Sequence, residues 1–132
     1  MAEKDFQSAF TRWMQYNVSV PAAFELKLSR GTSLPFDAVQ PHQELALKKT
    51  KDRGICYKIP DGTVAQKPFD CFYLKGEAYV VIMFYKRGQK EFFMIDIDVW
   101  LREKQVSKTD PEARKSLTLA RAYEIGTLCH LS

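Results

Sequence analysis

The longest apolar run of the chain spans residues 78–85 and has the sequence AYVVIMFY. Consecutive apolar positions over the length of one strand are typical of a strand that is buried on both faces. The run is far shorter than the roughly 20 apolar residues that a membrane-spanning helix needs, so no membrane partner is expected. The chain is therefore expected to fold around a central strand, with other elements covering both faces of its sheet.

The composition fits one globular domain. The chain has 132 residues, of which 45% are hydrophobic and 13% aromatic, so it is long enough for one core and too apolar for a disordered segment. Lys and Arg outnumber Asp and Glu by 20 to 16, and the net charge of +4 is compatible with a polyanionic partner.

Two further features concern the compartment. The first five residues, MAEKD, lack the apolar segment of a signal peptide, which predicts a cytosolic protein, or one of the host cytosol if the source is viral. The three cysteines, Cys56, Cys71 and Cys129, are odd in number and widely separated. This spacing predicts reduced and mostly buried thiols rather than a disulfide framework or a zinc site.

Periodicity and turn signals predict a mixed α/β order along the chain. Helices are expected over residues 5–16, 41–51 and 116–125, strands over residues 22–29, 55–59, 69–74, 78–85 and 91–100, and a polar loop over residues 104–115. We therefore expect one domain over residues 1–132, with its core over about residues 5–100 and a C-terminal loop and helix over residues 101–132.

Glu25 and Lys27 lie two positions apart in an alternating segment, so their side chains share one face of the predicted strand. The opposite face is apolar and anchors the strand in the core, through Phe24, Leu26 and Leu28. A carboxylate beside an ammonium suits metal-dependent phosphodiester hydrolysis, in which the carboxylate binds Mg²⁺ and the lysine orients water or stabilises the transition state. The alternative is a salt bridge on a solvated edge strand.

A metal site needs more than one oxygen ligand, and Asp70 is the candidate for the second. It shares a face of the predicted strand 69–74 with Phe72 and Leu74, where an unpaired carboxylate is unfavourable. The alternative is an aspartate that caps a turn at the start of the strand.

Gln43 lies in the first turn of the helix that Pro41 opens. If this helix packs behind the Glu25 strand, the Gln43 amide reaches a phosphate or a metal-bound water. The neighbouring His42 is a weaker candidate, and an ordinary polar first turn is the alternative for both residues.

Asp96 and Asp98 form a rival acidic pair, because alternate positions of the predicted strand 91–100 share a face. Two carboxylates at this spacing suit a metal ion, although such alternation is more often the solvated side of an amphipathic strand.

Basic residues cluster near the ends of several predicted elements. The candidates for contacts with DNA phosphates are Arg30, Lys48, Lys49, Lys51, Lys86 and Arg87. Solvated charge is also the default at element ends, and the chain contains no zinc-finger spacing, Walker-type loop or glycine-rich dinucleotide signature.

The segment FELKL at residues 24–28, the short loop with SLPF at residues 33–36, and His42-Gln43 at the start of a helix together resemble the PD-(D/E)xK nuclease superfamily. The similarity is greatest to the Holliday-junction resolvases of archaea, phages and some bacteria, and it covers roughly residues 5–100. The resemblance implies a restriction endonuclease-like α/β core with a central mixed sheet flanked by helices. It also implies Mg²⁺-dependent cleavage of branched DNA, with Mn²⁺ as a substitute, by a homodimer that acts in recombination and repair.

The resemblance assigns Glu25 as a metal ligand, Lys27 as the motif lysine and Gln43 as the glutamine of the following helix. The family usually places an Asp on the strand before the Glu-x-Lys strand, but no acidic residue lies between Asp5 and Glu25. Asp70 is the expected replacement, which makes Glu25 and Asp70 the expected metal ligands. A nucleic-acid-binding domain on the same fold that does not cut, or a protein-interaction domain that uses exposed aromatic residues, are the alternatives.

Overall fold

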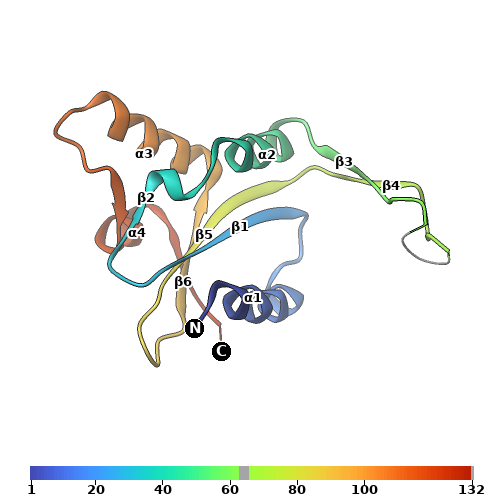
Figure 1. Cartoon of the computed structure of the whole chain (residues 1–132), viewed down its shortest axis with the longest axis horizontal. Helices are drawn as coiled ribbons and strands as arrows, with labels where there is room; N and C mark the ends of the chain where they lie inside the picture. The colour runs from blue at the N-terminus through green and yellow to red at the C-terminus, as the bar shows by residue number, and fades with distance from the viewer. Residues whose placement is uncertain (63–65, 132) are drawn as a thin grey trace.

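The computed structural model describes residues 1–62 and 66–131 (Figure 1). Its elements are α1 (Glu3–Asn17), β1 (Ala22–Ser29), β2 (Ser33–Pro35), the 3₁₀ helix η1 (Phe36–Ala38), α2 (Pro41–Asp52), β3 (Ile55–Lys58), β4 (Cys71–Leu74), β5 (Glu77–Phe84), β6 (Glu91–Asp96), α3 (Ile97–Thr109), β7 (Ser116–Thr118), α4 (Leu119–Ile125) and β8 (Thr127–His130). The expected α/β class is confirmed, because four α-helices accompany a mixed four-stranded sheet and two small two-stranded sheets.

The main sheet has the strand order β1-β5-β6-β8. β1 runs parallel to β5, whereas β6 and β8 continue the sheet in antiparallel pairs. Parallel neighbours need a crossover connection, and α2 lies within the one that joins β1 to β5. Figure 1 shows α1 and α2 on opposite sides of these two strands. The internal position of β5 confirms the central strand that the apolar run predicted.

Alternate residues of β5 enter two separate cores, as a strand covered on both faces requires. One core lies on the side of α2 and α3, and its members include Val80, Ile82, Leu47 and Trp100. The other lies on the side of α1, and its members include Val81, Met83, Phe6 and Phe10. The same alternation orients β1, because Phe24, Leu26 and Leu28 pack against the core on the α1 side.

Strands β3 and β4 pair in an antiparallel hairpin that projects from the body of the molecule (Figure 1). The described residues of this segment, 55–62 and 66–74, include both strands and are called the arm below. Ile55 pairs with Leu74 at the base of the arm, and the backbone N–H of Gly76 donates to the carbonyl of Thr50, 3.3 Å away. The two ends of the arm therefore meet at the C-terminal end of α2.

The expected strand over residues 91–100 is wrong in its second half. β6 ends at Asp96, whose carboxylate accepts a hydrogen bond from the backbone N–H of Asp98 and caps α3. Ile97, Trp100 and Lys104 follow at helical spacing and are buried. The expected loop over residues 104–115 is wrong in its first part, because α3 continues to Thr109, whereas residues 110–115 lie outside helices and strands as expected.

The C-terminal segment differs from the expected single helix over residues 116–125. Residues 116–118 form β7, which pairs with β2, and Thr118 rather than Ser116 caps the shorter helix α4. Gly126 follows α4 as expected, and residues 127–130 then add the edge strand β8. The pairings of β2 with β7 and of β8 with β6 had no local sequence signal.

The cysteines are free thiols, but the expectation that most are buried is wrong. Cys56 and Cys71 are exposed on the arm, and Cys129 is half-buried in β8. Among the helices of residues 1–62 and 66–131, none has the length and apolar character needed to cross a membrane.

A buried carboxylate joins α2 to α3. The indole N–H of Trp100 donates to Oε2 of Glu44 at 2.7 Å, and Nζ of Lys104 lies 3.1 Å from both oxygens of the same carboxylate. Lys104 also donates to the carbonyl of Val39 at 3.3 Å. All three side chains of this cluster are buried, so each charge depends on its partner.

We expect Glu44→Ala to lower the free energy of unfolding by about 3–5 kcal/mol, because the buried Lys104 ammonium loses its close carboxylate. It keeps only the exposed carboxylate of Asp37, 4.0 Å away, and the carbonyl of Val39. Urea denaturation measures the change. The matched control Glu124→Ala breaks an exposed ion pair with Arg121 and should change the same quantity by less than about 1 kcal/mol. Equal losses in the two variants would contradict a special role for the buried carboxylate.

Candidate functional site

Glu25 and Lys27 project from β1 on the side of α2, opposite to the apolar residues that pack toward α1. Nζ of Lys27 lies 3.5 Å from Oε1 of Glu25, and the two side chains are 19% and 28% exposed. They therefore form a partly buried ion pair rather than two fully solvated charges. This arrangement confirms that the two side chains share one face of the strand.

Gln43 completes this cluster from the first turn of α2. Its amide nitrogen donates to Oε1 of Glu25 at 2.8 Å, and its amide oxygen accepts a hydrogen bond from the backbone N–H of Gln40 at 2.9 Å. The second contact is the capping-box hydrogen bond at the start of α2, and it fixes the orientation of the Gln43 side chain. The helix therefore packs behind the Glu25 strand, which is the condition stated above for Gln43 to reach a phosphate or a metal-bound water. That role of the amide stays a prediction.

The carboxylate of Glu25 keeps one free oxygen. Both of its contacts, with Gln43 and with Lys27, involve Oε1. Within residues 1–62 and 66–131, nothing donates a hydrogen bond to Oε2. A ligand that approaches Glu25 therefore finds an oriented carboxylate with an available oxygen.

The backbone of β1 adds a second available oxygen. The carbonyls of Pro21 and Ser29 accept hydrogen bonds from Glu77 and Tyr85, on the side of β5. Because the direction of backbone groups alternates along a regular strand, the carbonyl of Leu26 points to the other edge. No strand in the described parts of the chain pairs with that edge.

Asp70 does not lie in this cluster. It stands immediately before β4 on the arm, its side chain is 93% exposed, and its ion-pair partner is Lys67 at 3.3 Å. The expected strand 69–74 begins two residues later, at Cys71, so Asp70 does not occupy the apolar face that the sequence suggested. The structure thus corrects the expectation that Asp70 and Glu25 jointly hold a metal ion.

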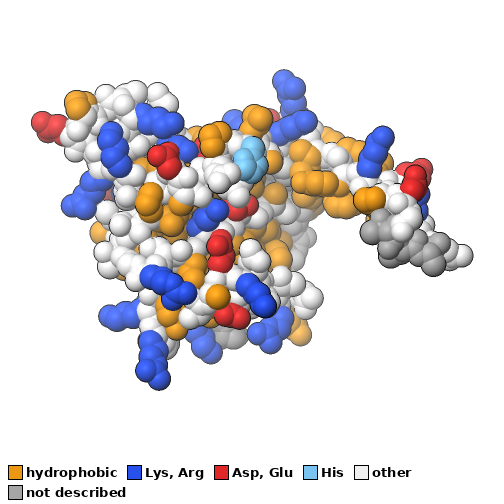
Figure 2. All heavy atoms as spheres, in the orientation of Figure 1, with side chains coloured by type: hydrophobic (Ala, Val, Ile, Leu, Met, Phe, Trp, Pro, Cys, Tyr) orange, Lys and Arg blue, Asp and Glu red, His pale blue; other side chains and the backbone are white. Residues whose placement is uncertain are grey.

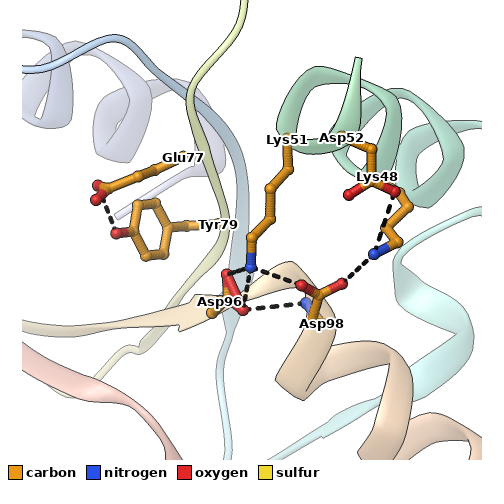
Figure 3. A network of polar contacts seen from close by, with 7 residues as sticks. All are labelled: Lys48, Lys51, Asp52, Glu77, Tyr79, Asp96 and Asp98. Atoms are coloured by element: carbon orange, nitrogen blue, oxygen red, sulfur yellow. Dashed lines mark hydrogen bonds and ion pairs between the residues drawn. The ribbon is translucent and has the colours of Figure 1, made fainter. Parts of the chain in front are cut away.

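The rival pair, Asp96 and Asp98, comes together but around lysines (Figure 3). Nζ of Lys51 lies 2.8 Å from Asp96 and 2.6 Å from Asp98, and Nζ of Lys48 lies 2.5 Å from Asp98. Two ammonium groups therefore supply the positive charge that a metal ion would bring. In the part of the chain that the structure describes, no three His, Cys, Asp or Glu side chains gather as a metal site.

The same contacts shift the acid–base behaviour of the network. The hydrogen bond from Lys48 is the largest cause that lowers the pKa of Asp98, and the one from Lys51 is the next. The hydrogen bond to Asp96 is the largest cause that raises the pKa of Lys51, and the one to Asp98 is the next. Burial, followed by the hydrogen bond to Glu77, raises the pKa of Tyr79 to about 12. These groups stay in one charge state near neutral pH, which suits a structural network.

The residues expected to contact phosphates fall into two groups: cations that are paired with carboxylates and cations that are not. Lys48 and Lys51 are held by the aspartates of the network, so the structure does not leave them available for DNA. Arg30 is exposed and donates to the carbonyl of Met1 at 2.8 Å. The other three expected contacts, Lys49, Lys86 and Arg87, are also exposed, and none of them has an acidic partner in the described residues.

Comparisons of the chain with protein-family models, with curated proteins and with solved structures found no match.

We expect Asp98→Asn to reduce the acid sensitivity of the fold. The pKa of Asp98 in the folded chain lies below its ordinary value of 3.8, so this carboxylate contributes stability that is present above pH 3.8 and is lost as pH falls toward the folded value. Thermal unfolding from about pH 5 down to about pH 2 should show a smaller loss of Tm in Asp98→Asn than in the wild type. Asp70→Asn serves as the matched control on an exposed carboxylate, and identical pH profiles for all three proteins would contradict the assignment.

Proposed function

We propose that the chain is a metal-dependent DNA endonuclease of the Holliday-junction resolvase type, on a variant of the restriction endonuclease-like core. The observation that carries the proposal is the cluster of Glu25, Lys27 and Gln43, in which an oriented carboxylate keeps one free oxygen. The order of elements supports it as well, since the Glu-x-Lys strand β1 is followed by α2 and by the parallel strand β5.

The oxygen donors of this cluster suit Mg²⁺ in a site that substrate helps to complete. Mg²⁺ keeps several waters and binds through one or two carboxylates together with substrate phosphates. Glu25, through Oε2, and the carbonyl of Leu26 would hold the ion, and Mn²⁺ would substitute because it prefers the same kind of ligand. The ion would neutralise charge on the phosphate and activate water for hydrolysis.

The protein side chains supply position and charge. Lys27 keeps a partly buried ammonium beside Glu25, where it stabilises negative charge that develops on the phosphate or orients the attacking water. Gln43 holds the carboxylate by Oε1, which leaves Oε2 for a ligand. The roles of Lys27 and Gln43 both require that α2 and β1 keep their relative positions.

The substrate we propose is branched DNA in the cytosol or host cytosol. The net charge of +4 and the exposed cations at Lys49, Lys86 and Arg87 favour contacts with phosphates. A four-way junction has two equivalent strands to cut, so the matching assembly is a homodimer with one site for each strand.

A specific observation favours a second candidate, a nucleic-acid-binding domain that does not cut. Glu25 is the sole carboxylate of the Glu25–Lys27–Gln43 cluster, and the described residues contain no three-ligand group around it. Such a domain would keep the basic surface and bind nucleic acid in a salt-dependent way without turnover.

We expect the wild-type protein to cut a labelled four-way junction in Mg²⁺ and the variants Glu25→Gln and Lys27→Met to do so at least about 100-fold more slowly. Single-turnover rates from denaturing gels give the comparison. The controls Glu124→Gln and Lys108→Met make the same chemical changes at exposed positions and should cut at the wild-type rate.

Failure of the folded wild type to cut junction, duplex or single-stranded DNA in Mg²⁺ or Mn²⁺ would overturn the enzymatic proposal. Binding that weakens with salt, in the same experiment, would then support the second candidate.

We expect Asp70→Ala to cut the junction within about twofold of the wild-type rate, because the ion pair of Asp70 is with Lys67 on the arm and not with the Glu25 cluster. The same single-turnover assay measures it. A loss as large as that of Glu25→Gln would show that Asp70 reaches an active site after all, and the placement of the metal ligands argued above would be wrong.

A further inference from the structure

The arm carries a pair of aromatic rings that the rest of the fold leaves exposed. Tyr57 of β3 and Phe72 of β4 are direct cross-strand partners. Their rings stack with centroids 5.6 Å apart and planes inclined by 30°, yet the residues are 53% and 48% exposed. Phe69, nearer the tip, is also exposed. Figure 2 shows hydrophobic side chains gathered over this projecting segment, with Lys and Arg side chains beside them.

The charges of the arm and its base are mainly positive. Residues 53–76 contain four Lys or Arg residues and two Asp residues. Both aspartates, Asp61 and Asp70, pair with Lys67, at 2.7 Å and 3.3 Å. The other three cations, Arg53, Lys58 and Lys75, are exposed and have no acidic partner within the described residues.

We propose that the arm binds unpaired nucleobases of a nucleic-acid strand, which stack on Tyr57 and Phe72 while the cations contact the phosphates. Aromatic side chains accept any base because every base presents a π-face, and a basic surface beside them follows the backbone. Lys58 follows Tyr57 directly in β3, so its side chain projects from the opposite face of the two-stranded arm. A strand of nucleic acid that stacks on the rings would contact this cation by passing around the edge of the arm. The proposal deepens the proposed function, since it names the part of a nucleic acid that the arm recognises, and it rests on that function for the choice of nucleic acid as the partner.

Charge favours a nucleic acid over a second copy of the chain as the occupant of this surface. In a symmetric dimer the same patch meets itself, so arm-to-arm contact would bring the unpaired cations of both copies close together. Like charges at short distance repel. A polyanion instead neutralises them and covers the rings.

The test measures binding without cleavage. Fluorescence anisotropy of a labelled single-stranded oligothymidine, in EDTA and low salt, should give a dissociation constant for the wild type and one that is about 5- to 100-fold weaker for Tyr57→Ala combined with Phe72→Ala. Tyr57→Phe combined with Phe72→Tyr keeps both rings and should bind as the wild type does. Tyr16→Ala removes an aromatic ring that is 87% exposed on α1 and should also leave binding unchanged.

A second readout distinguishes stacking from a general loss of structure. An oligonucleotide that carries 2-aminopurine should lose fluorescence when it binds the wild type and the ring-keeping variant, and much less when it binds the alanine double variant. Fully paired duplex should bind all of these proteins with similar affinity.

Unchanged single-strand affinity in the alanine double variant, or no single-strand binding by the wild type, would overturn the proposal. A change of molecular mass in that variant by light scattering, with unchanged affinity, would assign the arm to contact between two copies instead. EDTA prevents metal-dependent cleavage, so the binding test and the cleavage test in Mg²⁺ give independent results. If the protein binds single strands through the arm but does not cut DNA in Mg²⁺ or Mn²⁺, the endonuclease proposal is refuted and this inference stands.

Discussion

The position of α2 depends on the buried carboxylate of Glu44, which accepts hydrogen bonds from Trp100 and Lys104 of α3. A buried ion pair adds little net stability relative to apolar packing, but a missing partner is strongly unfavourable. The pair therefore acts mainly by excluding other placements of the helix. Gln43 precedes Glu44 in the sequence, and about 100° of helical rotation separates consecutive residues. Fixing Glu44 against α3 thus fixes Gln43 against β1. The geometry of the candidate site therefore depends on a contact that another face of the same helix makes.

Much of this arrangement was predictable because its signals are local. Three local patterns each predicted an element that the structure contains: alternation over residues 22–29, Pro41 at a helix start, and the apolar run over residues 78–85. The sequence also indicated that the helix packs behind the strand, whereas the direct contact between Gln43 and Glu25 emerged only from the structure. By contrast, Ile97 fits both a strand pattern and a helical one, and the capping carboxylate of Asp96 together with the buried contact of Trp100 decides for the helix. Local periodicity carries no information about that tertiary contact.

The acidic residues show a different limit of sequence reasoning. A sequence shows where carboxylates occur, but not which cation reaches each of them in the fold. Lys51 meets Asp96 from 45 positions away, which converts an apparent metal-ligand pair into a structural network. Asp70 was assigned to the interior of a strand and instead precedes one on an exposed arm. In both cases the missing information was the course of the crossover between β1 and β5.

The closed base of the arm separates the arm from the main sheet, so a change in one need not affect the other. Ile55 and Leu74 pair where the arm leaves the body, and Gly76 bonds back to Thr50. The two ends of the arm are therefore held together at its base, and this contact does not depend on the length of the arm. Loops tolerate length changes when their ends stay close together. Evolution can thus lengthen, shorten or resurface this projection without disturbing the sheet beneath it, so the arm can diverge independently of the scaffold.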